Sequence, residues 1–165
     1  MDETPRAGEA AAAYVARLAE AKARAVLARQ PQAIVLGADT TVVVDGDILA
    51  KPDDAADATR MVSRLAGRAH EVLTGVALVS ATWSRVKVAA TLVWFAPMSA
   101  SEIEAYVASG EPMDKAGAYG IQGRAARYVT RIDGSYSNVV GLPVALVHEL
   151  LAEYPRCEPE VPAPL

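Results

Sequence analysis

The residues of this chain that are best suited to chemistry are carboxylates and lysines, placed where strands or buried loops are expected. They are Asp39, Lys22, Lys51, Asp114, Lys115 and the amide Gln122, together with the acidic pair Asp2 and Glu3. Carboxylate oxygens bind hard cations, and lysines neutralise phosphate charge. The set suits Mg²⁺-assisted attack of water on a phosphoanhydride. The alternative is ordinary solvated charge on the surface.

Other catalytic classes lack their residues in this chain. Its two histidines are His70, at an expected strand start, and His148, on an expected helix, and neither is paired with a nucleophile. We expect both to be structural or exposed. The one cysteine, Cys157, lies in a proline-rich stretch, which excludes a disulfide framework and a cysteine metal site. Walker-type and dinucleotide-binding fingerprints are also missing from the sequence.

Length and charge favour one soluble domain. The 165 residues carry 16 basic and 20 acidic side chains, and the net charge of -4 argues against electrostatic capture of duplex nucleic acid. No apolar run reaches membrane-spanning length, and the first residues do not resemble a signal sequence. We expect a cytoplasmic α/β protein without nucleic-acid or membrane partners, with one domain over residues 1–154 and a flexible tail over 155–165.

The elements that position these side chains follow from local patterns. An alanine-rich helix is expected over residues 9–29, with an apolar stripe of Ala11, Val15, Leu18, Ala25 and Val26. Lys22 lies in the middle of this stripe. Its ammonium either reaches back to water along a packed stem or points into a cleft, and position alone leaves the two open.

The acid Asp39 is expected inside a bend. A strand over 33–36 and an extended segment over 41–44 flank residues 37–40, and Asp45-Gly46 predicts a hairpin. Asp39 then either caps local amides or faces a cleft at the end of a strand. Further elements are predicted by caps and periodicity: a helix from Asp53 or Asp54 to Leu65, strands over 71–79 and 86–95, a helix opened by a Ser99–Glu102 capping box, a strand over 127–132 and a closing helix over 143–154.

The run from Asp114 to Gly123 holds three glycines within seven positions, an acid–base pair and an amide. Such a loop either makes a tight connection between elements or lets the backbone approach a ligand closely. By itself the composition favours a tight connection, and the carboxylates and lysines elsewhere favour a ligand-binding role.

Six motifs, taken in order, resemble the Maf family of nucleoside triphosphate pyrophosphatases. They are Gly37–Thr40, Lys51-Pro52, Gly67-Arg68-x-His70, Thr74–Ala77, Asp114–Gly123 and Gly134–Pro143, within a resemblance that runs from Asp2 to about Leu151. The resemblance implies a mixed sheet like that of inosine triphosphatase, with a cleft between two lobes. It also implies Mg²⁺-dependent, or other divalent-cation-dependent, hydrolysis of a nucleoside triphosphate to its monophosphate and pyrophosphate.

Residue by residue, the resemblance implies these roles. Asp39 is similar to the general base or metal-binding carboxylate, and Glu3 to a second acid that shares the metal. Lys22 and Lys51 resemble phosphate-facing lysines. Thr40 and Gln122 match positions that separate a dTTP- and UTP-hydrolysing branch from one acting on methylated GTP, and here they resemble the first branch. Lys115, in the glycine-rich run, is expected to bind substrate as well.

The chain also departs from the family pattern. Ala50 stands where many members have glycine. The first strand and the Ser-x-Ser-Pro-Arg-Arg loop of the family are missing before Met1, so we expect a misassigned start, a shortened chain or a short paralogue. The alternative function is a non-catalytic nucleotide-binding or septum-related regulatory module, inactive without the arginine loop. For the oligomeric state, we keep a homodimer as an alternative to a monomer.

Overall fold

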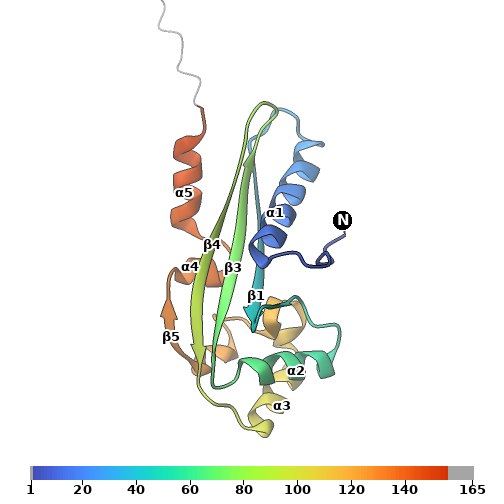
Figure 1. Cartoon of the computed structure of the whole chain (residues 1–165), viewed down its shortest axis with the longest axis vertical. Coiled ribbons are helices and arrows are strands. Elements are labelled where there is room, and N and C mark those ends of the chain that lie inside the picture. Colours follow the sequence, from blue (N-terminus) through green and yellow to red (C-terminus); the bar gives the residue numbers. More distant parts are fainter. Residues whose placement is uncertain (1, 156–165) are drawn as a thin grey trace, which may run out of the picture.

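Runs of valine, threonine and small residues form a five-stranded sheet in the computed structural model, which describes residues 2–155 (Figure 1). The spatial order is β2-β1-β3-β4-β5, and the bounds are β1 Val35–Val44, β2 Asp47–Leu49, β3 Ala69–Val79, β4 Ser84–Phe95 and β5 Val129–Asp133. The long pair β3 and β4 runs in register from Ala69↔Trp94 to Val79↔Ser84. It forms the spine of the molecule in Figure 1.

The α/β class is confirmed, but the prediction of a mixed sheet is wrong. Every strand pairing among the described residues is antiparallel. Tight turns reverse the chain between β1 and β2 and between β3 and β4, and β3 enters beside β1 in the opposite direction. Parallel neighbours would need crossover connections, whereas tight turns join β1 to β2 and β3 to β4.

Helices cover both faces and the lower end of the sheet. Their bounds are α1 Ala11–Leu27, α2 Ala55–Leu65, α3 Ala100–Ala108, α4 Tyr136–Val140 and α5 Val144–Glu153. Asp54 caps α2 through the Asp57 amide, and Ser99 and Glu102 form the predicted capping box of α3. Within residues 2–155, no helix combines the length and apolarity needed to cross a bilayer.

The two faces of β3 carry separate clusters because successive side chains alternate. On one face, Leu73 packs with α1, while Val76 and Leu78 pack with Leu150 of α5 on the other. A larger core lies at the lower end and joins α2, α3, the ends of the strands and the loop after α3. The cleft described below borders two of these clusters, through Tyr14 of the α1 cluster and Val42 and Val72 of the larger core.

Two local predictions are corrected by the structure, and one helix is added to them. Residues 35–44 form one continuous strand, so Asp39 lies in the middle of β1 rather than in a bend. Pairing with β3 and packing under α1 override the turn tendency of Gly37. The buried side of α1 includes Ala19 and Ala23, which pass directly over Gly37 of β1, whereas Val26 is exposed. The short helix α4 was not predicted.

The remaining predictions agree closely with the described elements. The expected strand at 127–132 begins later, at Val129, after a 3-10 turn over Arg124–Tyr128. The closing helix is present as α5. Cys157 and all but the first residue of the expected tail lie outside the described residues.

Candidate active site

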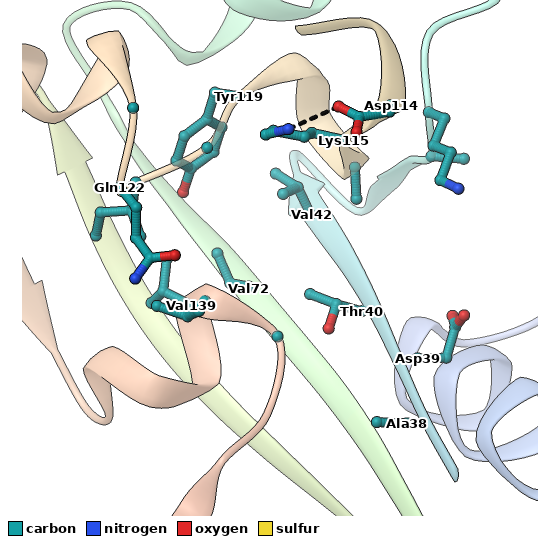
Figure 2. A pocket seen from close by; sticks show the side chains of 18 of the residues that line it. Ala38, Asp39, Thr40, Val42, Val72, Asp114, Lys115, Tyr119, Gln122 and Val139 are labelled. Atoms are coloured by element: carbon teal, nitrogen blue, oxygen red, sulfur yellow. Dashed lines mark hydrogen bonds and ion pairs between the residues drawn. The ribbon is translucent and has the colours of Figure 1, made fainter. Parts of the chain in front are cut away.

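A cavity of about 560 Å³ opens beside β1, and all seven residues predicted to bind substrate or metal, or to catalyse, line it. They are Glu3, Lys22, Asp39, Thr40, Lys51, Lys115 and Gln122. Figure 2 shows Asp39 and Gln122 at opposite sides of the cavity, with Thr40 between them and Lys115 above. The fold thus brings together residues that are widely separated in the sequence.

Asp39 is the most enclosed charged group of this cavity. Its side chain is 10% exposed, and Oδ1 accepts a hydrogen bond from Lys22 Nζ at 2.5 Å. The same Nζ lies 3.1 Å from Oε1 of Glu3. Of the two alternatives for Lys22, the structure shows a cation that faces the cleft between two carboxylates.

Glycines in β1 and β3 let α1 lie close enough to the sheet for Lys22 to contact Asp39. A Cβ on Gly75 would lie 2.3 Å from the carbonyl oxygen of Val15, and one on Gly37 would lie 2.3 Å from that of Ala19. Gly75 is also the register partner of Asp39. The backbone of α1 therefore rests directly on the sheet, which places the next turn of the helix, carrying Lys22, over Asp39.

Burial and neighbouring charge shift the pKa values of Asp39 and Lys22 in opposite directions. Burial raises the pKa of Asp39 above its ordinary value, although the hydrogen bond and charge of Lys22 oppose the shift. For Lys22, burial disfavours the ammonium, but Asp39 and Glu3 together raise the pKa. A carboxylate with a raised pKa is a stronger base and can accept a proton from water more readily.

The second wall of the cavity carries the other cations. Lys115 Nζ lies 2.6 Å from Asp114 Oδ1, and the lysine stem packs where a Cβ on Gly120 would be only 2.7 Å from Cε. Lys51 is exposed at the bend after β2. The pKa of Asp114 is lowered, first by the Lys115 hydrogen bond and also by the charge of Lys51. These lysines and Lys22 provide positive charge on several sides of one space.

Thr40 and Gln122 line the part of the cavity away from the ion pair. Side chains alternate along β1, so Thr40 faces the side opposite α1, where it pairs with Thr74 in register. The Gln122 side chain is exposed and makes no hydrogen bond to any described residue. Its amide donor and carbonyl acceptor are therefore both available to a ligand.

The loop that carries Gln122 is held by one partly buried carboxylate, that of Glu111. Glu111 accepts hydrogen bonds from the Arg124 amide, at 3.0 Å to each oxygen, and from the Tyr106 hydroxyl at 3.1 Å. Gly123 is required here, since a Cβ would lie 2.1 Å from Glu111 Oε1. Ala118 adopts a left-handed φ of 59°, a strained conformation that persists only in a well-held segment.

The carboxylates of Asp39 and Glu3 suit a divalent cation that also binds the substrate. Asp39 and Glu3 converge on one positive charge, the Lys22 ammonium, and Glu3 is 48% exposed. Within residues 2–155, no three Asp, Glu, His or Cys side chains cluster into a metal site of their own. One or two carboxylates plus substrate phosphates is the usual way in which proteins bind Mg²⁺.

Some residues at the cavity were not predicted from the sequence. Tyr14 donates a hydrogen bond to the Glu3 carbonyl at 2.9 Å and so holds the N-terminal segment at the rim. Val139 and Gly141 line the cavity from α4 and its end. Thr74 lies behind Thr40 at a hydroxyl distance of 2.8 Å. Thr74, Val139 and Gly141 belong to motifs quoted for the family resemblance, which was the one sequence signal available for them.

Comparison with known proteins gives a consistent result. The Maf-like protein family model matches residues 1–154. The dTTP/UTP pyrophosphatase of Symbiobacterium thermophilum is 54% identical over 154 residues, covering 93% of this chain and 79% of the relative. The proteins of the same name from Shewanella oneidensis and Hahella chejuensis are 53% and 55% identical, again over 93% of this chain and 80% and 78% of their own lengths.

Proposed function

This chain belongs to the Maf-like protein family, and from that membership and its cleft we propose that it hydrolyses dTTP and UTP to the nucleoside monophosphate and pyrophosphate. The observation that carries the proposal is a buried carboxylate, Asp39, in direct contact with Lys22 inside a nucleotide-sized cavity. Curated relatives at 50% to 55% identity are named dTTP/UTP pyrophosphatases.

In the proposed reaction, Asp39 accepts a proton from a water molecule. The water oxygen forms a bond to the α-phosphorus, and the bond from that phosphorus to the α,β-bridging oxygen breaks, which releases pyrophosphate. The raised pKa of Asp39 favours this proton transfer. Lys22 holds the carboxylate in place, so the base is fixed before substrate binds.

The lysines neutralise the charge of the triphosphate. Lys22, Lys51 and Lys115 all line the cavity, and each can contact phosphate oxygens from a different element. A bound Mg²⁺, held by Asp39, Glu3 and phosphate oxygens, would supply further charge neutralisation at the reacting phosphate. This arrangement leaves the exposed Glu3 free to adjust when substrate enters.

Base recognition is assigned to the other end of the cavity. An amide such as that of Gln122 can pair with both a carbonyl and the imide N–H of thymine or uracil. Its side chain is exposed and faces the cavity (Figure 2). We also assign residues 1–154 to one domain, in line with the family match, and place the activity in the cytoplasm.

The test is pyrophosphate release from dTTP, UTP, CTP and GTP in the presence of Mg²⁺. Asp39→Asn is isosteric and removes the base, so we expect kcat for dTTP to fall by about 100-fold or more. Asp47→Asn makes the same change on exposed β2, outside the cavity lining, and should leave kcat unchanged. The enzyme proposal fails if the unsubstituted chain releases no more pyrophosphate than Asp39→Asn from any nucleotide.

A further inference from the structure

A chain of hydrogen bonds leads from the cavity into the interior of the sheet. The Thr40 hydroxyl lies 2.8 Å from the Thr74 hydroxyl, which in turn lies 3.2 Å from the backbone carbonyl oxygen of Asn138. Thr74 is fully buried, whereas Thr40 is half-buried and lines the cavity, with its side chain labelled in Figure 2. Only the first member of this chain can therefore touch a ligand.

Counting donors fixes the direction of these bonds. The Thr74 hydroxyl has one hydrogen, and the Asn138 carbonyl can only accept. If that hydrogen pointed to Thr40, the lone pairs of Thr74 would face a carbonyl oxygen at 3.2 Å in a fully buried place. The opposite order satisfies both contacts: Thr40 donates to Thr74, and Thr74 donates to Asn138.

The last acceptor of the chain is rigidly placed. The Asn138 side chain is fully buried, and its Nδ2 donates to the Val72 carbonyl at 3.0 Å and to Thr91 Oγ1 at 2.9 Å. The Asn138 carbonyl also accepts from the Gly141 amide at 3.0 Å, and its two lone pairs accommodate both donors. The middle of α4 is thus anchored to β3 and β4, and the Asn138 carbonyl is held toward Thr74.

We propose that Thr74 is a specificity-positioning residue, which holds the Thr40 hydroxyl hydrogen away from the cavity so that Thr40 meets the nucleotide only as an acceptor. The proposal deepens the proposed function and rests on it. The matching ligand group is a hydrogen-bond donor. In the proposed substrates this donor is the imide N–H of thymine or uracil, and the Gln122 amide then pairs with a base carbonyl. The N3 atom of cytosine is an acceptor, and it would meet the lone pairs of Thr40 without a hydrogen between them.

The experiment measures equilibrium affinities for α,β-methylene analogues of dTTP, dCTP and 2′,3′-dideoxythymidine triphosphate. Thr74→Val keeps the shape but releases the Thr40 hydrogen, which can then be donated to N3 of cytosine, so the dTTP/dCTP affinity ratio should fall by roughly tenfold. The dTTP/dideoxy ratio is the internal control and should stay unchanged, because a sugar hydroxyl can accept a hydrogen bond as well as donate one.

Two further variants keep the result decisive. Thr74→Ser retains the hydroxyl and should restore the ratio that Thr74→Val lowers. Thr40→Val removes the acceptor itself from a half-buried position, and it should lower the same ratio even if Thr74→Val proves too unstable to use. Thermal melting of each variant shows whether it is folded.

Failure of this inference differs from failure of the proposed function. If the dTTP/dCTP ratio in Thr74→Val, or in Thr40→Val where Thr74→Val does not fold, stays within about twofold of the unsubstituted protein, the positioning role is overturned. The role is also overturned if the unsubstituted protein does not prefer the dTTP analogue to the dCTP analogue. Binding with these preferences but without pyrophosphate release would refute catalysis and leave the positioning of Thr40 standing.

Discussion

The buried imidazole of His70 makes a specific prediction about stability and pH. His70 is 2% exposed, its Nε2 lies 2.7 Å from the Tyr119 hydroxyl, and its ring packs edge-on against Phe95 at a centroid distance of 5.0 Å. Its Nδ1 is buried without a partner among the described residues. Burial lowers the pKa of His70 from 6.5 to about 4, because this pocket offers the imidazolium no compensating charge.

The sign and size of the effect follow from proton linkage. Because the folded-state pKa lies below the unfolded value, the unfolded chain binds more protons between pH 6.5 and pH 4. The stability contribution of neutral His70 is therefore complete above about pH 6.5 and is lost as the pH falls toward 4. With these two pKa values, acidification from pH 7 to pH 5 should lower the free energy of unfolding by about 2 kcal/mol.

Urea denaturation at pH 7 and pH 5 measures this loss. His70→Gln removes the titrating group, so its change in unfolding free energy between the two pH values should be about 2 kcal/mol smaller than that of the unsubstituted protein. The chain has only one other histidine, His148, which is exposed on α5 and provides the matched control variant His148→Gln. An equal pH dependence in His70→Gln and the unsubstituted protein would refute the assignment.

Two further substitutions test how the fold holds the cleft. Gly75→Ala places a Cβ 2.3 Å from the Val15 carbonyl oxygen, so α1 must shift; unfolding by urea should show a loss of about 3 kcal/mol, and dTTP hydrolysis should fall with it. Glu111→Ala leaves the Tyr106 hydroxyl and the Arg124 amide without their acceptor, which should cost about 2 kcal/mol by the same measurement and raise KM for dTTP as the loop loosens.

The outcomes that would contradict these two predictions are distinct. A Gly75→Ala variant with unchanged stability and activity would show that the helix–strand contact does not set the position of Lys22. For the loop, Glu104→Ala on α3 is the matched control, because Glu104 is exposed and makes no hydrogen bond to any described residue. Equal KM values in the Glu111 and Glu104 variants would show that Glu111 does not hold the base-reading loop.

Local chemistry predicted most of the elements. Asp54 and the Ser99–Glu102 pair mark the starts of α2 and α3, and the apolar runs around residues 71–79 and 86–95 give the long strand pair. These signals were sufficient because each acts over only a few residues. They failed at Gly37, where the turn tendency of glycine was overridden by the close packing of α1 on the sheet.

The sequence alone determined the chemical inventory: carboxylates, lysines and one amide, without a histidine base or cysteine nucleophile suited to catalysis. It also determined the family, because several ordered motifs are specific when taken together. Only the tertiary structure decided that Lys22 contacts both Glu3 and Asp39, and that Thr74 separates Thr40 from the Asn138 carbonyl. Such contacts depend on strand register and on the distance of α1 from the sheet. Both are set by packing between segments far apart in the chain, which local sequence patterns do not encode.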